Sequence, residues 1–168
     1  MKNNFKSKSG LPLIKFGERY LCSSVNPMKE AAAWIEKHKD FFVGVNDVMV
    51  LGVGCGYHIL ALLKQFVGIN IIAIDNTKEH IEFVKSEHSI AVSNVEFLCI
   101  KTSLEATQNI DIQNMVSRPY AVLKFSPAII TSPEFYFDLE VFLLARTEQG
   151  LDFIIKCRPD FKNLFITE

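Results

Sequence analysis

A chain of 168 residues is long enough for a single domain with one substantial hydrophobic core. Apolar residues make up 49% of the sequence and charged residues 22%, a balance that excludes a disordered chain. Eighteen basic and nineteen acidic residues give a formal net charge of -1, so we expect neither nucleic acid nor an anionic membrane as a partner.

The N-terminal segment MKNNFKSKSG is polar and basic and leads into no apolar core of a signal peptide. We therefore expect residues 1–10 to be a flexible tail. No run of about 18 apolar residues, the length needed to cross a bilayer, occurs. The four cysteines form no C-x-x-C pair, so we expect reduced, buried thiols and no metal site. Together these features predict a cytoplasmic protein.

Two short strands joined by a turn at Gly17-Glu18 are expected in LPLIKFGERYLCSS, residues 11–24. A helix follows, because Asn26 is a favourable N-cap, Pro27 suits the first helical position, and apolar residues recur on one face. Residues 11–45 thus form an N-terminal hairpin and helix within a single domain that spans residues 11–168.

From Val48 onward the pattern is strand, turn and helix, repeated. Strands are expected at 48–53, 69–74, 94–100, 120–125 and 151–157, and their nearly continuous apolar runs are typical of a parallel sheet covered on both faces. Helices are expected at 57–67, 77–88 and 133–150, with a short, irregular helix within 103–118. This order predicts an α/β, Rossmann-like, doubly wound sheet of five mainly parallel strands in the order 3-2-1-4-5. The final KNLFITE is a candidate edge strand.

Three glycines at alternate positions, Gly52, Gly54 and Gly56, separate the first strand of this series from the next helix. In an open α/β sheet, ligands bind beyond the carboxyl ends of the strands where the strand order reverses, and this turn lies there. Glycine lets the backbone bend sharply and approach a ligand, and the following helix offers free N–H groups. The turn is therefore a candidate ligand site.

The second strand ends at Asp75, twenty-one residues after Gly54. An acidic side chain at this position accepts hydrogen bonds from the hydroxyls of a ribose. The alternative is structural: the glycines permit tight packing of strand against helix, and Asp75 caps the next turn. We favour ligand binding, because both features lie where the fold requires them.

The run VMVLGVGCGYH, followed by IIAID and NVEFLCI, resembles the class I S-adenosylmethionine-dependent methyltransferases over about residues 48–125. In that family an acid-x-G-x-G-x-G turn follows a hydrophobic strand, and an acid ends the second strand. The resemblance implies S-adenosylmethionine as the cofactor and a methyltransferase-like transferase, with the acceptor and the catalytic residues unknown. The cofactor-binding residues that it implies are Gly52, Val53, Gly54, Cys55, Gly56, Tyr57, His58, Asp75, Asn76, Ile100 and Lys101.

Three positions depart from the family pattern. Gly52 stands where an acid is usual, His58 where the last glycine is usual, and Lys101 where an Asp commonly contacts the adenine amino group. These changes remove anionic partners of a doubly cationic cofactor and add groups that carry or can gain positive charge. A phosphate-bearing nucleotide is therefore the alternative small-molecule ligand.

A second resemblance covers about residues 12–75. CSSVNPMKEAAAWI and VLGVGCGYHI resemble the motility accessory factor glycosyltransferases and the related 6-hydroxymethylpterin diphosphokinase-like proteins. The matching residues are Ser23 (or Ser24), Pro27, Glu30 and Ala31, then the glycine turn through Tyr57 and His58. This resemblance implies ligands such as nucleotide-linked sugars, or pterin and ATP. A further alternative is a non-catalytic module that keeps the fold for protein interaction.

Several other side chains have two interpretations. His58 either contacts a phosphate or acts as an acid-base group, or it is a helix-start residue bonded to the backbone, which we favour. His80 and His88 are expected at the surface. Lys124, at the end of the fourth strand, faces an acceptor or extends into solvent. The helix around Phe135–Phe137 is apolar nearly all round, so it or the open sheet edge is a candidate surface for a homodimer.

Overall fold

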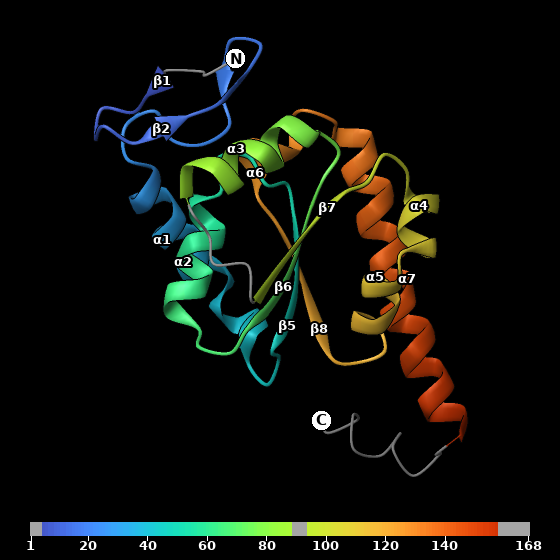
Figure 1. The fold of residues 1–168 in the computed structure, drawn as a ribbon. Helices are drawn as coiled ribbons and strands as arrows, with labels where there is room; N and C mark the ends of the chain where they lie inside the picture. Colours follow the sequence, from blue (N-terminus) through green and yellow to red (C-terminus); the bar gives the residue numbers. More distant parts are fainter. Residues whose placement is uncertain (1–4, 89–93, 158–168) are drawn as a thin grey trace.

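The computed structural model describes residues 5–88 and 94–157, with side chains in the last helix as far as Ala145. Its centre is a parallel sheet with helices on both faces (Figure 1). The strands are β5 (Asp47–Leu51), β6 (Asn70–Asp75), β7 (Val95–Cys99) and β8 (Tyr120–Lys124), in the order β7-β6-β5-β8. Within these residues no helix combines the length and the apolar character needed to cross a membrane.

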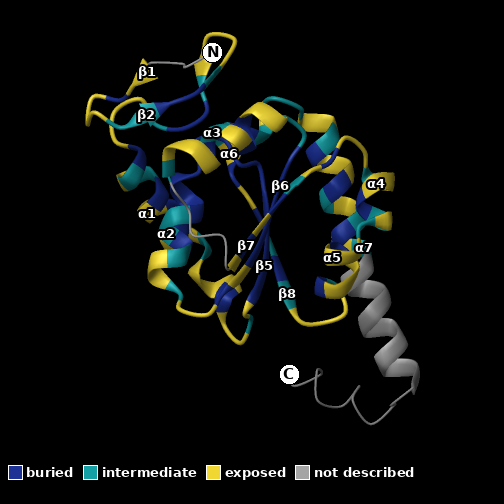
Figure 2. Cartoon of the chain, in the orientation of Figure 1, coloured by how far each residue is buried: buried dark blue, intermediate teal, exposed yellow. Residues whose placement is uncertain are grey.

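Two hydrophobic cores lie on the two faces of the sheet. One face is covered by α1 (Pro27–His38), α2 (Tyr57–Gln65) and α3 (Lys78–His88), the other by α4 (Ser103–Gln108), α5 (Ile110–Met115) and α7 (Pro133–Cys157). Side chains alternate along β5, so Val48 and Val50 enter the first core and Met49 and Leu51 the second. Every residue of β5 is buried (Figure 2), which confirms a doubly wound α/β arrangement of four parallel strands.

The predicted fifth strand is wrong. The helix that opens at Pro133 does not end at Gly150 but continues to Cys157, through the residues assigned to strand 151–157. The run LDFII is apolar at every position but one, and a short apolar run does not distinguish a strand from a buried helix. The five-stranded order 3-2-1-4-5 is therefore not confirmed, and the candidate strand KNLFITE lies outside the described residues.

Small antiparallel pairs precede the main sheet. The predicted hairpin around Gly17 is present as β3 (Lys15–Phe16) and β4 (Arg19–Tyr20). A second pair joins β1 (Phe5–Lys6) to β2 (Pro12–Leu13), so residues 5 and 6 of the expected tail take part in a sheet. A 3-10 helix, η1 (Lys39–Phe42), follows α1, and the short helix expected within 103–118 is present as α4 and α5.

The start of α1 accounts for the Ser-x-x-x-Pro-x-x-Glu pattern. The side chain of Asn26 caps the helix by accepting from the N–H of Lys29. Ser23 Oγ accepts from the N–H groups of residues 25 and 26, and Glu30 reaches back to accept the N–H of Ser23 at 2.7 Å. The contacts of Ser23, Asn26 and Glu30 thus stabilise the start of this helix.

Candidate functional site

The glycine turn lies where it was predicted, at the carboxyl end of β5. Gly52, Gly54 and Gly56 have φ angles of 90°, 48° and 77°, a region that other residues rarely adopt. The β3–β4 hairpin and the short helix α6 (Ser126–Ile129) lie at the same end of the sheet (Figure 1). The neighbours of the turn therefore decide whether a ligand reaches it.

The turn is packed against the rest of the chain on three sides. A Cβ built on Gly52 would lie 2.8 Å from the Cβ of Ala128 in α6. One on Gly54 would lie 2.8 Å from the carbonyl oxygen of Leu21, and one on Gly56 would lie 2.7 Å from the side chain of Val84 in α3. The glycines bring protein, rather than a ligand, against the backbone, and residues 52–58 are all buried.

The segment before α1 covers the turn through polar contacts as well. Tyr57 donates its hydroxyl to the carbonyl of Pro12 at 2.8 Å, and the N–H of Ile14 donates to the Cys55 sulfur at 3.4 Å. The pKa of the Cys22 thiol is raised by its hydrogen bond with Cys55 and by burial, so both sulfurs belong to the packed interior. Cys22 and Cys55 are reduced and buried as predicted, whereas Cys99 is exposed.

Asp75 makes internal hydrogen bonds and is fully buried. Its Oδ2 accepts the N–H of Val53 in the glycine turn at 2.8 Å. Its Oδ1 accepts the N–H of Thr77 at 2.9 Å and lies 3.0 Å from Nδ1 of His80. These contacts match the structural alternative, in which the carboxylate fixes the turn and the start of α3.

His58 points into the protein rather than towards a ligand. Its Nε2 lies 3.1 Å from the carbonyl oxygen of Gly52, its ring stacks on Phe125, and Trp34 packs edge-on against it. Burial lowers the pKa of His58 to about 3, so the imidazole is neutral at physiological pH. The backbone-bonded interpretation is confirmed, and the positive group expected beside a phosphate is not supplied by His58.

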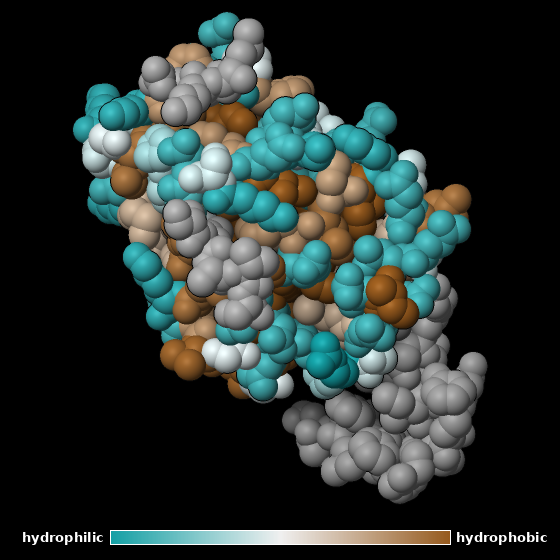
Figure 3. Space-filling view, viewed as in Figure 1, coloured by the Kyte–Doolittle hydropathy of each residue, from teal (hydrophilic) through white to brown (hydrophobic). Residues whose placement is uncertain are grey.

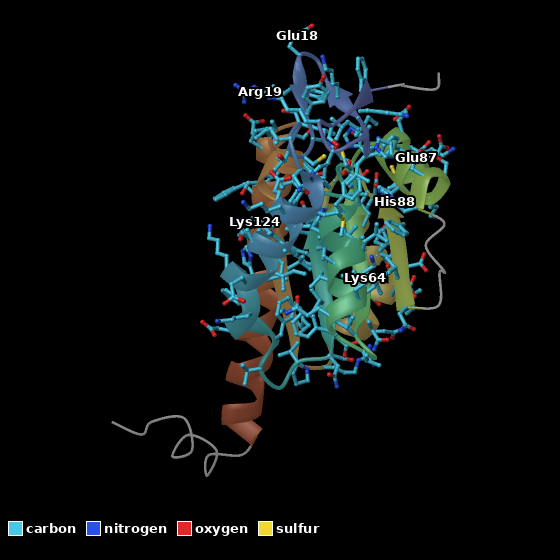
Figure 4. All side chains as sticks on the ribbon, turned by 90° about the vertical axis from the view of Figure 1, so that its left-hand side faces the viewer. Glu18, Arg19, Lys64, Glu87, His88 and Lys124 are labelled. Atoms are coloured by element: carbon cyan, nitrogen blue, oxygen red, sulfur yellow. The ribbon has the colours of Figure 1, made fainter. Side chains whose placement is uncertain are left out.

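His80 and His88, expected at the surface, are part of the same closure. His80 is buried against Asp75. Nε2 of His88 lies 2.7 Å from the carbonyl oxygen of Cys55, at the end of α3 (Figure 4). Burial lowers the pKa of His88. The surface prediction was wrong because both rings turn towards the glycine turn, where unpaired carbonyl and carboxylate oxygens need partners.

The remaining predicted residues form the rim of the site. The buried Ile100 donates its N–H to the carbonyl of Asp75 at 3.0 Å. Lys101 donates its ammonium group to the carbonyl oxygen of Asn76. All eleven predicted residues thus gather at the carboxyl edge of the sheet, but only Asn76 and Lys101 are not buried.

Two buried polar atoms near this edge have no hydrogen-bond partner among the described residues: Nδ1 of His58 and the hydroxyl of Tyr136. Burial raises the pKa of Tyr136, and the nearby carboxylate of Asp75 raises it further. Tyr136 is only 1% exposed, and its hydroxyl lies near Asp75, Asn76 and Thr131 without meeting hydrogen-bond geometry with any of them. The two atoms lie on opposite faces of the sheet, because His58 packs with Trp34 and Phe125 of the first core and Tyr136 belongs to the second.

The residues that close the crevice carry no functional pattern in the sequence. Ala128 lies in KFSPA, where Ser-Pro is a helix-start pattern, but this pattern does not predict that the helix packs over the end of β5. Leu21 and Val84 carry no comparable pattern. A separate cavity of about 310 Å³ opens at the other end of the sheet, lined in part by Asn70 and Arg118. No group of three or more metal-ligating side chains occurs in residues 5–88 and 94–145.

Comparison with known proteins gives little further information. No family model matches the sequence, and no curated protein matches it. One similar solved structure is the N-terminal domain of EvdMO1, crystallised in the presence of SAH (S-adenosylhomocysteine) and D-fucose. The two share 21% sequence identity with a TM-score of 0.35, over 52% of this chain and 37% of that chain. A similarity of this degree assigns no function to this chain.

Proposed function

We propose that this chain is a methyltransferase-like Rossmann domain that serves as a non-catalytic binding module. The observation that carries the proposal is the complete burial of the Asp75 side chain and its three contacts within the protein. The side chain on which the ribose assignment depended is fully buried and binds Val53, Thr77 and His80. A domain whose crevice is closed in this way binds other molecules through its outer surface.

Admitting a cofactor would carry a large free-energy cost. The ribose hydroxyls would have to displace internal partners of Asp75, and each hydrogen bond to a charged group contributes about 1.5–3 kcal/mol. The adenosyl group would also have to displace Ala128 and Leu21, which lie against the glycines. A ligand must repay both costs before it gains affinity.

Ligand-dependent thermal stability tests this proposal. A ligand at 100 times its Kd stabilises a protein by about 2.7 kcal/mol, which raises the Tm of a domain of this size by roughly 5–10 °C. We expect S-adenosylmethionine, S-adenosylhomocysteine, ATP and CMP each to leave the Tm unchanged. A rise of several degrees with any of them, matched by saturable heat in calorimetry, would contradict the closed crevice.

A second candidate function has one observation in its favour. The hydroxyl of Tyr136, close to Asp75, offers a polar contact to an adenosyl or nucleotide ligand if the crevice opens. Tyr136→Phe separates the two proposals. For a closed module this change removes an unsatisfied group, so the unfolding free energy stays constant or rises. For a nucleotide-binding protein the unliganded stability changes in the same way, but Tyr136→Phe reduces the rise in Tm that ATP or S-adenosylhomocysteine produces, a rise that the closed module does not show.

A further inference from the structure

Charge is distributed unevenly along the chain, although its sum is close to zero. The N-terminal arm, residues 5–25, holds four basic residues and one acidic residue, Glu18, which give it a formal charge of +3. Residues 26–145 hold nine basic and fourteen acidic residues, a formal charge of -5. The near-zero net charge predicted that nucleic acid is not a partner, but a local cationic surface attracts an anionic polymer whatever the sum.

The arm stands at one end of the molecule and is held there by internal contacts. Its strands β1 to β4 lie beyond the carboxyl edge of the sheet (Figure 1), and Glu18 and Arg19 form the tip of the hairpin (Figure 4). The N–H of Lys8 donates to the carbonyl of Ser24 at 2.9 Å, and the arm is bonded to the glycine turn as described above. A surface fixed in this way loses little conformational entropy on binding.

The cations of the arm have no carboxylate beside them. None of the four forms an ion pair with a described residue: Lys6, Lys8, Lys15 and Arg19. In the rest of the described chain, by contrast, four cations are paired with carboxylates: Lys39, Lys78, Arg118 and Lys124. The charge of the arm is therefore free to meet an anion from outside the molecule.

Aromatic rings lie among these cations. Directly opposite residues of a hairpin share a face, so Phe16, which is 49% exposed, lies beside Arg19. The next pair, Lys15 and Tyr20, lies on the other face. There Nζ of Lys15 is 4.6 Å from the ring centre of Tyr20 and 4.8 Å from that of Phe5, which is 39% exposed. Hydrophilic and hydrophobic residues are accordingly interspersed over the arm, at the top of Figure 3.

We propose that the N-terminal arm binds single-stranded nucleic acid. The inference rests on the proposed binding-module function and names the class of its partner. Phosphates contact the lysines and Arg19, and an unpaired base stacks on the ring of Phe16; unpaired strands are bound by this combination of cations and exposed rings.

The placement of the rings favours this partner over other anions. Phe16 lies on one face of the hairpin and Phe5 packs on the other, so a flat bilayer cannot take up both rings. A flexible single strand can follow the hairpin from one face to the other. An acidic protein segment matches the charge but offers no base to stack on a ring.

Fluorescence anisotropy of labelled oligo(U) and oligo(dT), each about 20 nucleotides long, tests the proposal with the full chain. At about 50 mM salt we expect both to bind with a Kd of about 10 µM, because phosphates and base faces are common to RNA and DNA. The logarithm of the affinity should fall with the logarithm of the salt concentration with a slope of about -2, as about three phosphate contacts require.

Two variants of the arm, each with a matched control, locate the site. We expect Arg19→Glu to raise the Kd at least about tenfold and Phe16→Ala at least about fivefold. Lys64→Glu makes the same charge change at an exposed position on α2, away from the arm (Figure 4). Phe137→Ala removes a ring that is 64% exposed on α7. Both controls should bind as the wild type does.

Three results would overturn the inference. The first is an unchanged anisotropy at up to about 100 µM protein, and the second is an arm variant that binds as tightly as its control. The third is displacement of the labelled oligonucleotide by poly-glutamate, or by phosphatidylserine vesicles, as readily as by unlabelled oligo(U), because these competitors share only the negative charge. None of these results changes the Tm test of the closed crevice, so failure of the inference and failure of the proposed function are distinguishable.

Discussion

The carboxyl edge of the sheet and its β8 flank differ in which of their polar and apolar groups lack a partner within the described chain. At the carboxyl edge, Asp75 and the glycine turn have internal partners, and of the eleven predicted site residues only Asn76 and Lys101 are not buried. At the β8 flank, the backbone of Val122 and three large apolar side chains of α7 lack partners in the described chain. The position at which a Rossmann-like fold usually binds ligands is thus not the position at which this chain has free binding capacity.

Loss of the Asp75 carboxylate should have the largest effect. We expect Asp75→Asn to lower the unfolding free energy by about 4 kcal/mol, because the amide NH2 group would face buried donors. Urea unfolding measures this change, with Asp138→Asn, an exposed position on α7, as the control within about 0.5 kcal/mol of wild type. If Asp75 were free for a ribose, its replacement would cost little stability.

A side chain added in the glycine turn should have the next largest effect. We expect Gly52→Ala to lower the unfolding free energy, measured with urea, by about 3 kcal/mol, because Gly52 has a positive φ and the added Cβ would collide with Ala128. Gly68→Ala, with a similar φ of 82° and nothing within 4 Å, should cost only about 1 kcal/mol.

The double variant Gly52→Ala, Ala128→Gly tests the contact itself. Its loss of unfolding free energy should be about 1 kcal/mol smaller than the sum of the losses in the two single variants. Strictly additive costs would show that α6 does not close the turn.

Acid should destabilise the closed crevice through His58. The pKa of His58 is lowered in the fold, so its contribution is complete above the unfolded pKa of about 6.5 and is lost as the pH falls towards 3. His88, with a pKa lowered by burial, acts in the same direction. Below pH 6.5 we expect His58→Phe to reduce the slope of unfolding free energy against pH by up to about 1.4 kcal/mol per unit. An unchanged slope would show that His58 titrates normally.

The smallest effect should come from the open flank. Val122→Pro removes an N–H that the isolated chain does not use, so we expect a loss of about 1 kcal/mol or less when measured on the monomer. Ala121→Pro, one residue earlier, removes an N–H that faces β5 and should cost about 3 kcal/mol or more. Equal losses for the two variants would mean that the β8 edge is already paired.

Local patterns predicted the sheet, the glycine turn and the entry to α1, because each depends on residues adjacent in sequence. Apolar runs marked β5 to β8, and Asn26 with Pro27 marked the start of α1. The run that ends α7 failed because its period is ambiguous. Closure of the crevice depends on Leu21, Val84 and Ala128 meeting the glycines across the fold, and no local pattern carries that information.

Residue-resolved amide hydrogen exchange compares the two regions in one measurement. We expect the N–H of Val53, which donates to the buried Asp75, to exchange only on global unfolding, with or without S-adenosylhomocysteine or ATP. The N–H of Val122, which has no partner in the described chain, should exchange quickly in the same sample. Rapid exchange at Val53 that slows only when a ligand is added would contradict the closed crevice.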